Sequence, residues 1–147
     1  MTGELLRLSE TPLHERRAWE SGGITVLTAE VTLPRCGGGG RRARRFDRYY
    51  RQYARAYLKY CETELLPRAA ETMRAAMERS APWKSAHAAL GYTVTLARGK
   101  ILSVCTRSAE EELVPRLIQC RAEVWDMEKA LPLALTDFCP ARTTVKK

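Results

Sequence analysis

The sequence predicts a small α+β domain with the element order β-α-β-β-β. We expect a strand and a long kinked helix, then a three-stranded antiparallel meander, with the helix packed on one sheet face. Three patterns support this: a β-branched run at 24–33, a helical period at about 42–79, and strand-like alternation from 92 onward. The 147 residues fit one domain, and hydrophobic and charged fractions of 45% and 29% are ordinary for a globular protein.

The first expected strand, residues 24–33, starts after two glycines and stops at Pro34. Residues 1–23 mix charged and apolar positions without a clean period, so they predict a loosely structured lead-in. Residues 37–40 are four glycines, which predict a flexible linker. A phosphate-binding loop would need Gly-Lys-Ser/Thr at their end, whereas Arg41 and Arg42 follow.

The long helix is predicted from about Arg42 to about Arg79, with a kink or break at Pro67, because proline removes a helical hydrogen bond and clashes with the preceding turn. Aromatic and basic residues recur every three or four positions on separate faces. We expect the aromatic face to pack on the sheet rather than to stack on nucleic-acid bases. Its members are Phe46, Tyr50, Tyr53, Tyr57 and Tyr60.

The meander is predicted from its alternation. A two-residue turn at Arg98-Gly99 places Leu96 opposite Ile101. A third strand at about 116–125 would follow an acidic loop at 109–112, with Cys105 opposite Cys120. The apolar face expected to meet the helix is Tyr92, Val94, Leu96, Ile101, Ser103, Cys105, Ile118, Cys120, Ala122 and Val124. The predicted organisation is therefore a lead-in over 1–23, one α+β domain over 24–140 and a C-terminal tail over 141–147.

The positive charge is concentrated in the predicted helix. Residues 35–59 contain nine basic residues and one acidic residue, Asp47, a difference of 9 − 1 = +8, which equals the formal net charge of the whole chain. A basic stripe of this kind is either a solvated helix face or a binding surface for an anionic partner. The candidate anion-binding or partner-binding residues are Arg41, Arg44, Arg48, Arg51, Arg55 and Lys59.

Motifs for catalysis, metals and cofactors are absent from the sequence. The five cysteines are widely spaced without a Cys-x-x-Cys pair, which disfavours a zinc site. The serines have no Gly-x-Ser-x-Gly frame, and His14 and His87 lie in no catalytic motif. We therefore expect no enzyme activity, no metal and no cofactor. Cys105 and Cys120 are expected to be reduced core neighbours, with a disulfide as the alternative.

The sequence also bears on location. It contains neither a run of about 20 apolar residues that would span a membrane nor the apolar region of a secretory signal. We therefore expect a cytoplasmic protein without membrane insertion.

Several short motifs follow one another in an order that resembles a known family. They are Leu33-Pro34, Arg45-Phe46-Asp47-Arg48-Tyr49-Tyr50, Tyr60-Cys61, Leu65-Leu66-Pro67, the hairpin 92–104, Trp125-Asp126, Leu131-Pro132-Leu133 and Asp137-Phe138-Cys139-Pro140. Over residues 23–140 the chain resembles the uncharacterised bacterial domain of RsiV-like, lysozyme-sensing anti-sigma factors. That domain also accompanies a peptidoglycan deacetylase and occurs in small free-standing proteins.

The resemblance implies a non-catalytic binding or regulatory domain with a protein partner, and it leaves an envelope-associated role open. Lysozyme itself is a poor match, because lysozyme is basic and so is this chain, and like charges oppose association. The alternative function is binding of nucleic acid or another polyanion through the basic helix from Arg41 to Lys59.

Overall fold

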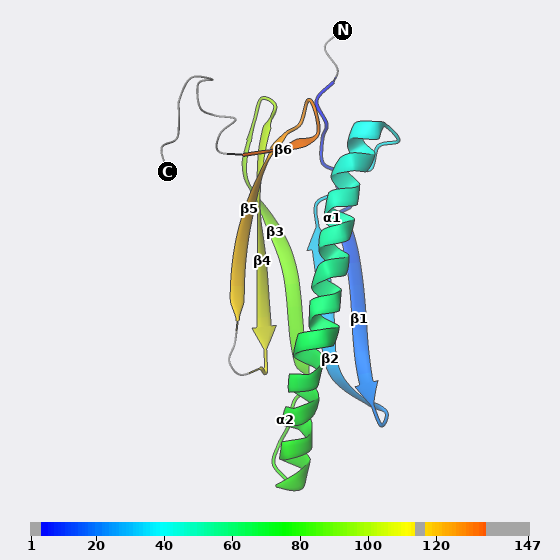
Figure 1. Cartoon of the computed structure of the whole chain (residues 1–147), viewed down its shortest axis with the longest axis vertical. Coiled ribbons are helices and arrows are strands. Elements are labelled where there is room, and N and C mark those ends of the chain that lie inside the picture. The colour runs from blue at the N-terminus through cyan, green and yellow to red at the C-terminus, as the bar shows by residue number, and fades with distance from the viewer. Residues whose placement is uncertain (1–3, 114–116, 135–147) are drawn as a thin grey trace.

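The computed structural model describes residues 4–113 and 117–134. A helical rod crosses one face of a six-stranded sheet in which the strands lie in chain order (Figure 1). The strands are β1 (Leu13–Ser21), β2 (Ile24–Leu33), β3 (Ala86–Arg98), β4 (Ile101–Glu111), β5 (Ile118–Asp126) and β6 (Leu131–Leu133). The rod is α1 (Arg41–Tyr60), a π-helical turn η1 (Cys61–Leu65) and α2 (Leu66–Glu78).

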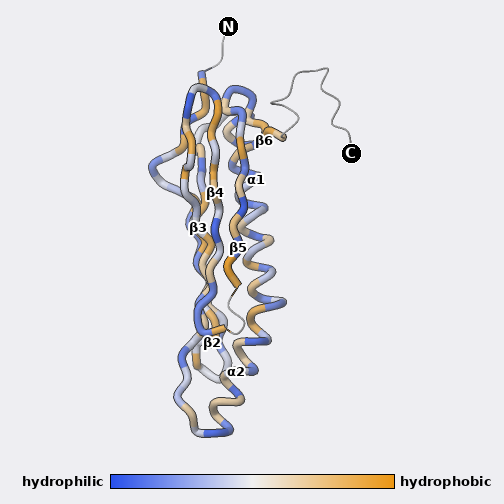
Figure 2. The backbone as a smooth tube through the Cα atoms, turned by 90° about the vertical axis from the view of Figure 1, so that its left-hand side faces the viewer, coloured by the Kyte–Doolittle hydropathy of each residue, from blue (hydrophilic) through white to orange (hydrophobic). Residues whose placement is uncertain are grey.

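The sheet is mixed. Neighbouring strands are antiparallel except β2 and β3, which are parallel with Leu27 beside Ala86 and Val31 beside Leu90. A parallel pair needs a long crossover, and the helical rod provides it. Figure 2, turned by 90°, shows α1 as a second layer beside the sheet. The α+β class and the long kinked helix are confirmed, whereas the sheet has two more strands than predicted.

One added strand is β1, which lies where the sequence predicted an irregular lead-in. It pairs with β2 through a turn at Gly22 and Gly23, which have φ of +59° and +79°. A Gly-Gly turn with two positive φ values is a strong hairpin signal. The strand was missed because it is an edge strand with charged side chains on both faces, so it lacks apolar alternation. The other added strand is the three-residue β6.

The helix is irregular just before the proline. Pro67 lies in the first turn of α2, where a missing N–H is tolerated, and η1 directly precedes it. A π-helical turn widens the helix by one residue and accommodates the interrupted hydrogen bonding. The rod therefore continues past the predicted kink to Glu78.

The predicted hairpin register is wrong by one position at the turn. The turn residues are Gly99 and Lys100, so that Arg98 opposes Ile101. Gly99 has φ +56°, and glycine at the first position of a two-residue turn is typical of type II′, which the prediction did not consider. A bulge between Val94 and Leu96 shifts the register again along β3.

The prediction for β4 and β5 is wrong in register and in face. Cys105 lies opposite Ala122 rather than Cys120. The side chains that meet the helix are Leu102, Val104, Thr106 and Trp125, all buried. Ten residues were predicted to meet the helix, and eight of them lie on the outer sheet face instead: Leu96, Ile101, Ser103, Cys105, Ile118, Cys120, Ala122 and Val124.

Side-chain size explains the inversion. Four of these eight outer-face residues are small (Ser103, Cys105, Cys120 and Ala122), whereas the opposite face buries an indole together with leucine and valine, which removes more apolar area from water. The acidic loop predicted at 109–112 is also wrong in part, because β4 continues to Glu111.

The core lies between α1 and the strands β2–β5. Small side chains at Ala29, Ala54 and Ala88, all fully buried, let the helix approach the sheet closely. An aromatic cluster closes one end, with the Phe46 and Trp125 rings 4.6 Å apart between centroids.

Candidate functional site

The basic row comprises Arg41, Arg44, Arg48, Arg51, Arg55 and Lys59 of α1. All six side chains are exposed, and for Arg48, Arg51 and Arg55 this was predicted from the helical period. From the first to the last residue the row spans about 27 Å at 1.5 Å per residue. The opposite face of α1 is fixed in the core by Phe46, Tyr50 and Ala54, none of them accessible to solvent. The row therefore projects from a rigid element.

Two further arginines attach the start of α1 to the turn between β5 and β6. Arg42 Nη1 donates to the carbonyl oxygen of Glu128 at 2.7 Å, and Arg45 Nη1 donates to that of Lys129 at 3.1 Å. These two arginines therefore contribute to the fold through backbone carbonyl groups, and we do not count them in the basic row.

The charges of the basic row are not neutralised by acidic side chains. Within 4–113 and 117–134, the salt bridges are His14–Glu30, Arg121–Glu123 and those of Arg74 in α2, and none involves the row. Asp47 instead accepts backbone N–H bonds from Cys36 at 2.7 Å and Gly37 at 3.2 Å. Within the described part of the chain, no residue of the row therefore forms a salt bridge.

The lower end of the row borders a shallow groove between α1 and β1. Arg55 and Lys59 line it from the helix and Arg17 from the strand, together with Glu15 and Glu62. Its volume is about 560 Å³. The two carboxylates reduce the local positive charge there. The N-terminal and middle parts of α1 are therefore more cationic than its C-terminal end.

The tyrosine face packs on the sheet, as predicted. Tyr50 is fully buried, whereas Tyr53, Tyr57 and Tyr60 are half-buried against the core. The Tyr53 hydroxyl bonds to Thr106 Oγ1 at 3.1 Å, and Tyr60 donates to Glu110 at 3.1 Å. These contacts leave the rings poorly placed to stack on nucleic-acid bases.

Two buried glutamates were missed by the sequence reasoning. Glu110, expected in a solvated loop, is 2% exposed and accepts bonds from the Tyr60 hydroxyl and from the backbone N–H of Leu117. Glu123 is 8% exposed and accepts bonds from Tyr49 and Arg121. The series of tyrosines along α1 could have indicated these glutamates, since buried phenol hydroxyls need hydrogen-bond acceptors.

Burial raises the pKa of several groups on α1 and next to it. The pKa of Tyr49 rises to about 12 through burial and the neighbouring Glu123 carboxylate. Burial also raises the pKa of Cys36 to about 12 and of Cys61 to about 11. A nucleophilic thiol requires the opposite shift, because the thiolate is the reactive form. Both thiols are therefore poor nucleophiles.

The cysteines and histidines are dispersed. Cys36, Cys61, Cys105 and Cys120 are free thiols, and Cys139 lies outside the described residues. No group of three potential metal ligands occurs in the part of the chain that the structure describes. In the same part, no helix is both long and apolar enough to cross a membrane.

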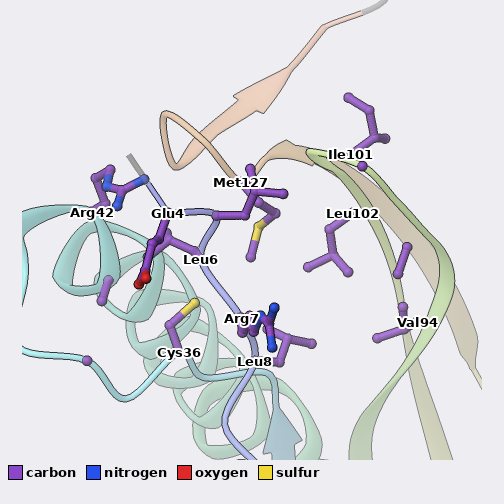
Figure 3. Close-up of a pocket in the computed structure, with 15 residues that line it drawn as sticks. Glu4, Leu6, Arg7, Leu8, Cys36, Arg42, Val94, Ile101, Leu102 and Met127 are labelled. Carbon is purple, nitrogen blue, oxygen red and sulfur yellow. The ribbon is translucent and has the colours of Figure 1, made fainter. Parts of the chain in front are cut away.

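A cavity of about 990 Å³ lies at the end of the molecule where α1 begins (Figure 3). Its walls come from residues 4–8, the start of α1 and the β3–β4 hairpin. This cavity was not predicted, because residues 4–8 were assigned to the loosely structured lead-in. Backbone bonds hold this segment, from Leu6 N–H to the carbonyl of Met127 at 3.0 Å and from Ser9 N–H to that of Arg35.

Together these features define a class, an α+β domain in which one kinked helix with a basic outer face crosses a six-stranded mixed sheet. The fold is similar to that of a DUF3298 family member from Bacteroides fragilis, with a TM-score of 0.53 and 17% identity over 92% of this chain and 61% of that chain. A DUF3298 family protein from Pseudomonas aeruginosa matches with a TM-score of 0.47 and 11% identity, over 92% and 58% of the two chains. No protein-family model and no curated protein matches the sequence.

This chain thus spans about three-fifths of the length of the solved structures that it matches. At 17% identity the similarity to the Bacteroides protein shows the fold alone. The DUF3298 family includes RsiV-like domains, so the similarity agrees with the sequence resemblance at the level of fold.

Proposed function

We propose that this chain is a non-catalytic binding domain whose binding surface is the basic row of α1 and whose ligand is an extended polyanion. The observation that carries the proposal is six exposed cations on one rigid helix without a salt bridge among the described residues. Phosphate-rich polymers bind such rows by displacing counterions, and nucleic acid is the simplest example.

The chemistry of the remaining polar groups supports a non-catalytic role. The buried carboxylates Glu110 and Glu123 accept hydrogen bonds from tyrosine hydroxyls. Cys36 and Cys61 have raised pKa values, which keeps both thiols protonated at neutral pH. These groups stabilise the helix–sheet packing, and their arrangement resembles neither a nucleophile–base pair nor an acid–base pair.

A protein partner is the second candidate, since the RsiV-like resemblance implies one. The same row would then select an acidic protein surface by charge complementarity. The two candidates differ in the spacing of the negative charges, which is regular in a phosphodiester and irregular on a protein.

Fluorescence anisotropy with labelled single-stranded and duplex oligonucleotides tests the proposal. We expect both to bind at low salt, and we expect a variant with Arg48, Arg51 and Arg55 changed to Gln to bind much more weakly. The matched control changes three exposed arginines elsewhere, Arg16, Arg79 and Arg107, so the net charge falls equally. If both variants lose affinity equally, or if the native protein does not bind, the proposal that the basic row is the polyanion-binding surface is refuted.

A further inference from the structure

The cavity at the start of α1 is lined mostly by apolar residues. It lies between residues 4–8 and the β3–β4 hairpin, and Figure 3 shows side chains from both walls lining one space. Its volume of about 990 Å³ is at the upper end of the range for small-molecule sites, which are mostly apolar with a few polar groups. The apolar lining comes chiefly from Leu5, Leu6, Leu8, Val94, Leu102 and Met127.

The apolar lining reaches the surface. Leu5 and Val94 are 41% and 38% exposed, although both are large apolar side chains. The bulge between Val94 and Leu96 keeps Val94 on the cavity side of β3 while Leu96 turns to the outer face. A ligand in the cavity would therefore remove apolar surface from water without displacing any core residue.

Two cationic side chains line the cavity. They are Arg7 from the N-terminal segment and Arg42 from α1. The acidic residue among the lining side chains is Glu4. An anionic group at the cavity mouth would therefore meet a net positive potential.

We propose that this cavity binds an amphiphile with an apolar chain and an anionic head group, the chain lying against Leu102 and Met127 and the head group close to Arg7. The Cys36 thiol in the lining is neutral at physiological pH, because burial raises its pKa to about 12. The thiol therefore adds no opposing charge. An extended polyanion fits this cavity poorly, since a charged backbone would lie against leucine and methionine side chains.

The inference is independent of the proposed function. The cavity residues and the row residues Arg48, Arg51 and Arg55 share no member. Failure of one proposal therefore leaves the other standing.

Isothermal titration calorimetry with decanoate and with decanol, which share a ten-carbon chain, tests the proposal. We expect decanoate to bind more tightly, and we expect Arg7→Gln to weaken decanoate about tenfold or more while leaving decanol unchanged, since a bond to a charged group contributes roughly 1.5–3 kcal/mol. Equal binding of the two compounds, no effect of Arg7→Gln, or no decanoate binding at all would overturn the proposal.

A matched pair of tryptophan variants locates the site. Val94→Trp should fill the cavity and abolish decanoate binding, whereas Leu96→Trp, on the outer face, should bind normally. Ala97→Phe, also in the lining, replaces Val94→Trp if circular dichroism shows that Val94→Trp is unfolded. The variant with Arg48, Arg51 and Arg55 changed to Gln should bind decanoate normally. Loss of binding in that variant or in Leu96→Trp would place the amphiphile elsewhere and refute the cavity.

Discussion

The Trp125 indole N–H donates a hydrogen bond of 2.9 Å to the hydroxyl of Tyr50. The two residues come from β5 and α1 and are 1% and 0% exposed, so water cannot replace either partner. Phe46 contacts both rings, with centroids 5.0 Å from Tyr50 and 4.6 Å from Trp125. This contact attaches the helix to the far side of the sheet and fixes which face of β5 turns inward.

The Tyr50 hydroxyl is the acceptor of this bond. Removing this one oxygen atom should therefore destabilise the protein more than the small change in side-chain size suggests. Tyr50→Phe keeps the ring but leaves the indole N–H buried without a partner, at a cost of about 1–3 kcal/mol. Urea denaturation of native, Tyr50→Phe, Trp125→Phe and double variants measures it, since the double variant carries no unpaired N–H and the losses should not add. Additive losses would show that the bond contributes nothing.

The inward and outward faces of the meander can be separated by mutation. Leu102→Ala and Val104→Ala should each lower the free energy of unfolding by a few kcal/mol, about 2–5 for the leucine, because both side chains are buried under α1. Leu96→Ser and Ile118→Ser should change it by only about 0.5 kcal/mol, because both are 48% exposed. The reverse order in urea denaturation would restore the face assignment made from the sequence.

Local signals in the sequence were enough to predict α1, β2 and the basic row. The 3.6-residue period placed Arg48, Arg51 and Arg55 on one exposed face, and Pro34 marked the end of β2. Each of these predictions depends only on the spacing of residues within one element, and that spacing can be read directly from the sequence. The prediction for α1 succeeded although no acidic or side-chain cap marks its start at Gly40.

Predictions that needed two elements at once were less successful. Alternation cannot tell which face of β4 meets a helix when both faces carry apolar residues. That choice depends on Trp125 and Tyr50, which are 75 positions apart. The cavity is also formed by two segments that are far apart in the sequence, residues 4–8 and the β3–β4 hairpin.

The observed register makes a disulfide between Cys105 and Cys120 unfavourable. The two residues are diagonal rather than directly opposite, since Cys105 faces Ala122 and Cys120 faces Arg107. Diagonal Cα atoms lie about 7–8 Å apart, beyond the roughly 4.4–6.8 Å that a disulfide spans. In a Cys139→Ser background, mild peroxide followed by mass spectrometry should yield no such crosslink, and iodoacetamide should label exposed Cys120 before buried Cys61. A crosslinked peptide would contradict the register.

The protein should lose stability in alkaline solution. Burial raises the pKa of Cys36 from 9.0 to about 12, of Cys61 from 9.0 to about 11, and of Tyr49 from 10.0 to about 12. The folded state then binds more protons than the unfolded state in this range, so stability is complete below pH 9 and falls as the pH rises from 9 toward 12. Urea denaturation at pH 8, 9.5 and 10.5 measures the decline. Cys61→Ala should flatten it, and an unchanged curve in that variant would show that Cys61 does not contribute.

The salt dependence of nucleic-acid binding gives the most direct measure of how the basic row acts. Each phosphate neutralised on duplex DNA contributes a slope of about −0.9 to log K against log salt. If four or five of the six cations engage, the affinity should fall by roughly two to three decades between about 50 and 200 mM salt. Changing Arg48, Arg51 and Arg55 to Gln removes three contacts and should reduce the slope by about 2.7. The fold should persist, because exposed substitutions usually change stability by about 0.5 kcal/mol or less, and circular dichroism checks this.

The Arg16, Arg79 and Arg107 control should keep the native slope, because these side chains lie off the row. A native slope in the row variant would show that the cations of α1 do not contact the phosphates, and the row would then be a solvated face of the helix.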